Sequence, residues 1–125
     1  MKKQLEITVL TRENLMRAFW SLYCQKKIDH ISIKEITDKA GYHRSTFYEY
    51  FIDIYDVLNQ LEDELLAKIE EEVIQGFDVE SQNNLAQAVA DFYEAQGEYL
   101  RVLLGENGDP HFVKRIKEEM GFALI

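Results

Sequence analysis

Hydrophobic residues recur at steps of three and four positions along most of the chain, which is the spacing of amphipathic α-helices. The first such stretch is predicted to run from a cap at Thr11 to about Lys26. Residues 1–10 have no clear period and no cap, so we expect them to form a flexible arm. The buried stripe of the first helix is predicted to contain Leu15, Phe19, Leu22 and Tyr23.

Residues 32–51 predict two short helices joined by a tight turn. Ser32 can cap the first helix while the Glu35 side chain returns to the Ser32 amide, which is a capping box. Gly41 can adopt the positive φ angle that ends this helix. The second helix begins near Arg44, so the segment has the geometry of a helix-turn-helix, in which the second helix enters the major groove of DNA. With the preceding helix, this segment should enclose a small core of Phe19, Ile28, Ile33, Ile36, Phe47 and Phe51.

A long acidic helix is predicted next, from a cap at Asp53 to about Gly76. Its length of roughly 30 Å is enough to join a small head to a separate body. Glu62 and Glu64 lie on different faces of this helix, and both are expected to be solvated. The buried stripe is predicted to contain Ile54, Leu58, Leu61, Leu65, Ile69 and Val73.

The last part of the chain predicts further helical pieces over residues 85–96 and 98–104. A final helix is predicted to start at Asp109 and Pro110, after the strongest loop signal in the sequence. The buried positions of these helices are predicted to be Leu85, Ala88, Val89, Phe92, Tyr93, Tyr99, Leu100, Leu103, Leu104, Phe112, Val113, Ile116 and Met120.

The whole pattern predicts an all-α fold: a three-helix helix-turn-helix head, joined by the long helix to a small helical-bundle body. The net charge differs between the predicted head and the predicted body. Residues 1–52 carry nine Lys/Arg and six Asp/Glu, a net charge of +3, whereas residues 53–125 carry five and seventeen, a net charge of −12. A basic head on an acidic body would confine DNA contact to the head, although the whole chain has a net charge of −9.

Composition and motifs argue against several other classes of protein. The single Cys24 cannot form an internal disulfide and fits a reducing compartment. No apolar run approaches the roughly 20 residues of a membrane helix, and the N-terminus lacks the apolar region of a signal peptide, so we expect a cytoplasmic protein without a membrane partner. The sequence has no Glu-x-x-His pair, P-loop, zincin or G-x-S-x-G motif. We therefore expect no metal, no cofactor and no enzymatic activity.

The run ITDKAGYHRSTFYEYF, residues 36–51, resembles the DNA-binding segment of the TetR family of bacterial transcriptional regulators. The Ala-Gly turn followed by T-F-Y-x-Y-F carries the resemblance, which extends over about residues 11–66. It implies a regulator of transcription, typically a ligand-responsive repressor that binds palindromic double-stranded operator DNA as a homodimer. Position by position, it implies DNA contacts from Lys34, His43, Arg44, Ser45, Thr46, Tyr48 and Tyr50.

The resemblance further implies that residues 53–125 form a regulatory and dimerisation domain with a site for a small-molecule effector. This domain is expected to be incomplete, because two helices that form the dimer interface in the family are missing. The apolar segment Phe122–Ile125 either offers a surface for a partner or packs back on the body. The candidate effector-site residues are Phe92, Tyr93, Tyr99 and Leu103, although an aromatic stripe at helical spacing more often forms an ordinary core.

Some residues depart from the family pattern. His43 stands where a capping Ser or Thr is common, Glu49 places a negative charge on the second helix, and Ile54 stands where many members have a phosphate-binding Lys. These departures indicate weaker or differently oriented DNA binding. They leave open a second hypothesis, a helical protein-interaction module whose vestigial DNA-binding head acts by association with a partner.

Overall fold

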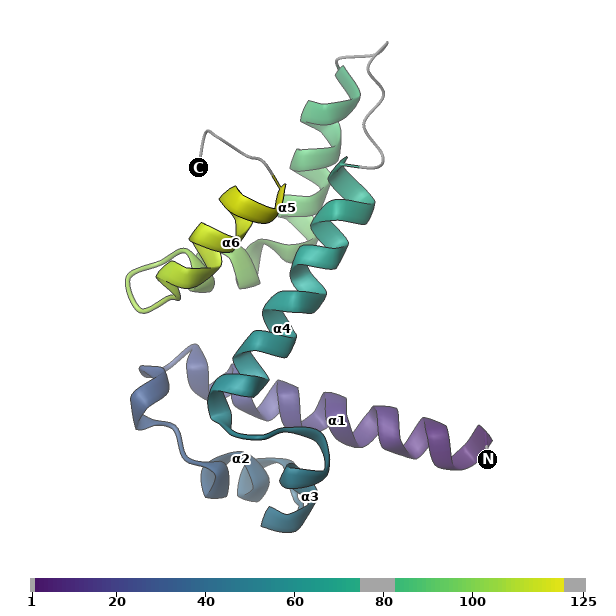
Figure 1. The fold of residues 1–125 in the computed structure, drawn as a ribbon, viewed down its shortest axis with the longest axis vertical. Helices are drawn as coiled ribbons and strands as arrows, with labels where there is room; N and C mark the ends of the chain where they lie inside the picture. The colour runs from purple at the N-terminus through teal and green to yellow at the C-terminus, as the bar shows by residue number, and fades with distance from the viewer. Residues whose placement is uncertain (1, 75–82, 121–125) are drawn as a thin grey trace. The chain divides into compact units, whose positions relative to one another are not determined.

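The computed structural model of the chain describes residues 2–74 and 83–120, and all of the secondary structure in these ranges is helical (Figure 1). The predicted all-α fold class is thereby confirmed.

The chain divides into two compact units, Met1–Leu61 (unit 1) and Glu62–Ile125 (unit 2). The division falls within helix α4 (Ile54–Ile69), whereas the sequence predicted a boundary between residues 52 and 53. The first turns of α4 belong to unit 1 because their polar side chains bond to the helices before them.

Unit 1 begins with α1 (Lys2–Tyr23), a single helix of 22 residues. The predicted flexible arm is therefore wrong for residues 2–10, which are helical. Thr11 is not a cap but lies within the helix, where its Oγ1 donates a hydrogen bond to the Ile7 carbonyl at 2.8 Å. A threonine hydroxyl can bond either a nearby amide or the carbonyl four residues back, and α1 uses the second arrangement.

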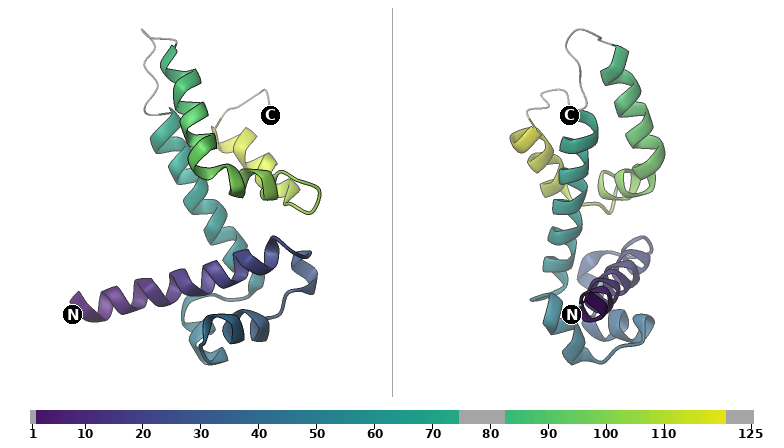
Figure 2. Two further views of the ribbon diagram at one scale, coloured as in Figure 1. Left: turned by 180° about the vertical axis from the view of Figure 1, so that it is seen from behind. Right: turned by 90° about the vertical axis from the view of Figure 1, so that its right-hand side faces the viewer.

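A 3-10 turn, η1 (Ile28–His30), leads from α1 to α2 (Ile33–Ala40), and α3 (Arg44–Tyr50) follows after a short turn. Figures 1 and 2 show α2 and α3 on the same side of α1. Their shared core is close to the predicted one: Leu15, Met16, Phe19, Tyr23, Ile31, Ile36, Phe47 and Phe51 are buried, whereas Leu22, Ile28 and Ile33 are half-buried.

Helix α4 begins with the predicted cap. The Asp56 amide donates to Asp53 Oδ1 at 2.8 Å, and the Ile52 amide donates to Asp56 Oδ2 at 2.9 Å. These two bonds fix the start of α4 directly after α3. The predicted stripe is buried at Leu58, Leu61, Leu65, Ile69 and, in the π-helical turn η2 (Glu70–Ile74), at Val73, while Ile54 is half-buried.

Unit 2 also contains α5 (Asn83–Leu103) and α6 (Pro110–Met120). Helix α5 is continuous, so the predicted break between residues 96 and 98 is wrong. The predicted start of α6 is correct, since Asp109 Oδ1 accepts a hydrogen bond from the His111 amide at 3.0 Å. The predicted end of the long helix near Gly76 and the apolar segment Phe122–Ile125 lie outside the described residues.

Burial on α5 follows a narrower stripe than predicted. Phe92 and Leu103 are buried, but Val89 and Tyr93 are 49% and 52% exposed. Val89 and Tyr93 are exposed because they project to one side of the helix face that carries Phe92 and Leu103. Leu104 is also exposed, whereas Phe112 and Ile116 of α6 are buried as predicted.

Glu62 departs furthest from expectation, because its side chain is fully buried in unit 2. Neither carboxyl oxygen has a hydrogen-bond partner of good geometry among the described residues. Arg115 reaches only to 4.0 Å from Glu62 Oε1, since its guanidinium bonds Asp63 at 2.6 Å and Glu119 at 3.3 Å. Burial raises the pKa of Glu62 to about 9, and the nearby Asp109 carboxyl group raises it in the same direction. Glu62 is therefore neutral at pH 7 in the folded chain.

Replacing Glu62 with glutamine should remove a pH-dependent loss of stability. The pKa of Glu62 is about 9 in the folded chain, against 4.5 for an ordinary glutamate, so between these values the folded state holds a proton that the unfolded state has released. Stability therefore falls as the pH rises through this window, by at most about 1.4 kcal/mol per pH unit. Denaturant unfolding from pH 5 to 9 should give a shallower slope for Glu62→Gln than for the wild type. Glu70→Gln, at an exposed position, should keep the wild-type slope, and equal slopes for all three proteins would contradict a buried, protonated Glu62 carboxyl in the folded chain.

Candidate nucleic-acid interface

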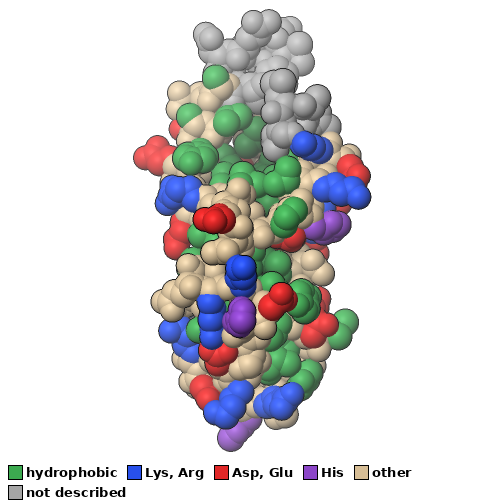
Figure 3. Space-filling model, turned by 90° about the vertical axis from the view of Figure 1, so that its left-hand side faces the viewer, with side chains coloured by type: hydrophobic (Ala, Val, Ile, Leu, Met, Phe, Trp, Pro, Cys, Tyr) green, Lys and Arg blue, Asp and Glu red, His purple; other side chains and the backbone are tan. Residues whose placement is uncertain are grey.

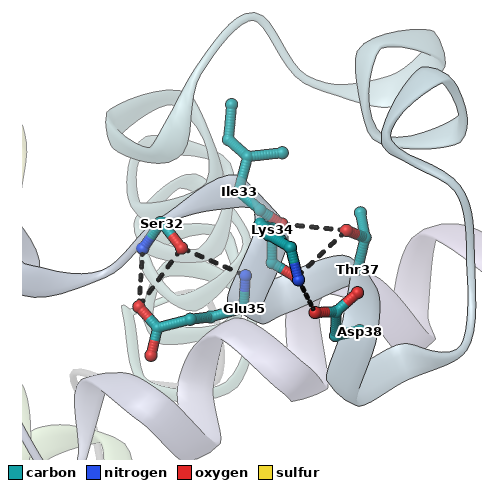
Figure 4. Close-up of polar contacts among 6 residues, drawn as sticks. All are labelled: Ser32, Ile33, Lys34, Glu35, Thr37 and Asp38. Atoms are coloured by element: carbon teal, nitrogen blue, oxygen red, sulfur yellow. Dashed lines mark hydrogen bonds and ion pairs between the residues drawn. The ribbon is translucent and has the colours of Figure 1, made fainter.

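Helix α2 is held at its start by a complete capping box (Figure 4). The Ser32 hydroxyl accepts a hydrogen bond from the Glu35 amide at 3.1 Å, and the Glu35 carboxylate accepts one from the Ser32 amide at 3.1 Å. The Glu35 carboxylate also pairs with Lys26, and the hydrogen bonds from Lys26 and Ser32 lower the pKa of Glu35. Local sequence therefore sets where α2 begins.

The turn after α2 directs the chain into α3. Gly41 has φ +83°, the left-handed conformation that favours glycine. The amides of Gly41 and Tyr42 both donate to the Thr37 carbonyl, at 2.8 and 2.9 Å. The Tyr42 hydroxyl accepts a hydrogen bond from Asn14 Nδ2 at 3.0 Å, which ties the turn to α1.

Helix α3 has only seven residues and is anchored by one aromatic side chain. Phe47 is fully buried, and its ring centre lies 5.3 Å from that of Phe51. His43 is the N-cap residue, and its side chain makes no capping hydrogen bond, as its departure from the usual Ser or Thr predicted. The Thr46 amide instead donates to the His43 carbonyl at 3.0 Å. Packing of Phe47, rather than capping, holds α3 in place.

The polar residues of α3 form two exposed rows. Ser45 and Glu49 lie one turn apart on the side opposite Phe47. Arg44 and Tyr48 form the second row, in which Arg44 Nη2 donates to the Tyr48 hydroxyl at 3.3 Å and the guanidinium lies 5.8 Å from the ring centre. This pair presents donors and a ring to solvent, the groups that bind phosphates and base edges.

The predicted DNA-contact residues differ in exposure. His43, Arg44, Ser45 and Tyr48 are exposed, whereas Thr46 and Tyr50 are half-buried.

Lys34 lies apart from them on α2 and forms a 2.6 Å ion pair with Asp38. The hydrogen bond with Asp38 raises the pKa of Lys34. Exposed ion pairs are weak, so Lys34 can exchange Asp38 for a phosphate at little cost.

The predicted effector-site residues share α5 but not one surface. Phe92 and Leu103 are buried and Tyr99 is half-buried, and these three lie on one stripe at steps of seven and four residues. Tyr93 points about 100° away from Phe92 and is 52% exposed. The effector site stays a prediction.

The sequence did not predict the role of two polar side chains on α1 and α4, which bond to the turn before α3 and to the end of α3. Asn14 of α1 bonds the Tyr42 hydroxyl, and Gln60 of α4 bonds both Arg12 and the Tyr50 carbonyl. Asn14 and Gln60 are half-buried beside the apolar stripes of their helices. Half-buried polar groups usually have protein partners, so a polar residue flanking an apolar stripe is the signal that could have found them.

Figure 3 shows one face of the molecule, on which basic and acidic side chains are interspersed. Within residues 2–74 and 83–120, no group of three or more His, Cys, Asp and Glu side chains is placed to hold a metal ion. In the described part of the chain, no helix combines the length and the apolar character needed to cross a membrane.

Comparisons of the chain with protein-family models, with curated proteins and with solved structures find no match. The candidate interface therefore rests on the geometry of α2 and α3 and on the sequence itself.

Substituting Gly41 should test the turn that sets the direction of α3. Gly41→Ala should lower the free energy of unfolding by about 1 kcal/mol, because an L-residue is strained at φ +83° although space for a Cβ is open. Gly41→Asn should cost less, since asparagine tolerates this conformation. Denaturant unfolding measures both variants. A Gly41→Ala protein as stable as the wild type, or less affected than Gly41→Asn, would contradict this account of the turn.

Proposed function

We propose that this chain is a DNA-binding regulator of transcription, similar to the TetR family, which inserts α3 into the major groove of a palindromic operator. The observation that carries the proposal is the exposed Arg44–Tyr48 row on a short helix that the buried Phe47 anchors. The role is binding rather than catalysis.

Each part of the interface has a chemical role in this proposal. The Arg44 guanidinium can make two hydrogen bonds to guanine, and Ser45 can bond to either base edges or phosphate. The Tyr48 hydroxyl and Lys34 would contact phosphates and so set the register of the protein on DNA. Because Tyr48 already holds Arg44, less side-chain entropy is lost when Arg44 binds.

The regulator is proposed to act as a dimer and to respond to a small molecule. Two half-sites one helical turn apart, about 34 Å, require two copies of α3 at a fixed spacing. An effector bound in unit 2, with Phe92, Tyr99 and Leu103 as candidate contacts, would change that spacing and release the operator.

A protein-interaction role is the second candidate, because specific surface features favour it. Glu49 would face DNA phosphates from the outward row of α3, where its charge is unfavourable. Apolar side chains are exposed elsewhere in unit 1: Leu5 is 66% exposed and Ile52 is 79% exposed. An oligomeric-state measurement by analytical ultracentrifugation separates the two candidates, since a strict monomer at high concentration is incompatible with the dimeric regulator.

Replacing Arg44 with alanine tests the proposed role of α3. The wild-type chain is first used to select a DNA duplex from a random library. The selected duplex is then labelled with a fluorophore, and its binding is measured by fluorescence anisotropy. Arg44→Ala should weaken binding by about 1–3 kcal/mol, through loss of a bidentate base contact, and Tyr48→Ala should also weaken it. Arg17→Ala removes the same charge from an exposed position on α1 and should have a much smaller effect. The assignment of α3 fails if Arg44→Ala and Tyr48→Ala leave affinity unchanged.

Replacing Glu49 with glutamine should strengthen DNA binding. Its carboxylate lies on the outward face of α3 with Ser45, so neutralising it removes repulsion from phosphates. We expect a gain of roughly 0.5 kcal/mol, about twofold in affinity, that shrinks as salt is raised. Glu13→Gln, an exposed position on α1, is the matched control. If both variants gain equally, or neither does, the outward face of α3 is not the DNA-facing surface.

A further inference from the structure

Gln60 of α4 forms hydrogen bonds to α1, to α3 and to Asp56 of its own helix. Its Oε1 accepts hydrogen bonds from Arg12 Nε at 3.2 Å and Arg12 Nη2 at 2.7 Å, on α1. Its Nε2 donates to the Tyr50 carbonyl at 3.3 Å, at the end of α3, and to Asp56 Oδ2 at 3.2 Å. The orientation of the amide is fixed by its partners, because the reverse orientation would place Oε1 against a carbonyl and a carboxylate.

The hydrogen bond from Gln60 satisfies a backbone carbonyl at the C-terminal end of α3. Tyr50 is the last residue of the helix, and the final carbonyls of a helix lack partners within it. Asp56, in the first turn of α4, belongs to the same hydrogen-bond network. Its Oδ2 also accepts a hydrogen bond from the Ile52 amide, between α3 and α4, at 2.9 Å. Arg12, while bonded to Gln60, lies with its guanidinium 5.9 Å from the Phe51 ring centre. The C-terminal end of α3 is thus fixed by one half-buried amide and its neighbours.

We propose that Gln60 is a positioning residue for DNA recognition: by bonding α1, the last carbonyl of α3 and α4 together, it sets the angle at which α3 presents its polar rows. This inference rests on the proposed function. It explains how an α3 that lacks a side-chain cap at His43 holds a defined orientation. Loss of Gln60 should leave the charge of unit 1 unchanged, so it should reduce sequence discrimination and not general attraction to DNA.

Two variants separate the two ends of the Gln60 amide. Gln60→Met keeps the length of the side chain and removes all of its hydrogen bonds. Gln60→Glu keeps an acceptor for Arg12 but can donate neither to the Tyr50 carbonyl nor to Asp56. Asn59→Met makes the same change of an amide to a thioether at the neighbouring exposed position and is the control.

The experiment combines two measurements on the full chain, at a temperature where every variant is folded. Hydrogen exchange measures local opening, and anisotropy measures the ratio of affinity for the selected duplex to affinity for a scrambled one. Gln60→Met and Gln60→Glu should speed exchange of α3 amides about tenfold relative to α1 amides and reduce the affinity ratio about tenfold. Affinity for the scrambled duplex should stay within about twofold for Gln60→Met, and Asn59→Met should match the wild type.

The outcomes distinguish this inference from the proposed function. Exchange that rises equally in α1 and α3, or an unchanged affinity ratio, overturns a positioning role for Gln60. If the wild-type chain selects no DNA sequence, the proposed function fails, and the exchange of α3 relative to α1 alone decides whether Gln60 positions the helix. Rapid exchange of α3 in Gln60→Glu with α1 still protected supports the bonds donated by Gln60 Nε2, to Tyr50 and Asp56, as the ones that hold α3.

Discussion

Seven residues are too few for a helix to persist alone in water, so α3 depends on tertiary contacts. Phe47 supplies the main one, since it is fully buried against the core that α1 and α2 share. Gly41 sets the direction in which the chain enters α3, and Gln60 holds its far end. Every polar group on the outer side of α3, including the Arg44–Tyr48 pair, keeps its place only while Phe47 stays buried.

Sequence was sufficient where a local interaction decides the structure. The capping box of Ser32, the left-handed Gly41 and the cap at Asp53 each depend on residues within a few positions, and all are present. It failed at Thr11, because one hydroxyl can satisfy either of two nearby backbone groups. It failed at Gln60 because the partners of that amide are brought near only by folding. The outer surface of α3 was predictable from Phe47, since a single buried position fixes which residues point away from it.

Unit 2 illustrates a different limit of sequence reasoning. Glu62 stands in an acidic, water-facing sequence, yet its carboxyl is fully buried and its pKa is raised to about 9 by burial first and by Asp109 second. An acidic residue can be buried if its carboxylate takes up a proton, and the cost in folding free energy grows as the pH rises. Arg115 would be the obvious partner, but it bonds the exposed Asp63 more closely. Glu62 and Asp63 of α4 compete for Arg115 of α6, and the spacing of residues along α4 alone cannot predict which of them Arg115 bonds.

We propose that α3 contacts DNA through its two exposed rows. The most direct measurement is nuclear magnetic resonance of the isotope-labelled chain during titration with a duplex selected from a random library. If α3 binds DNA in this way, the largest amide shifts should occur in residues 44–50, with a smaller one at Lys34, and added salt should reverse them. Largest shifts in α5 or α6, or no shifts with the duplex in excess, would contradict this proposal.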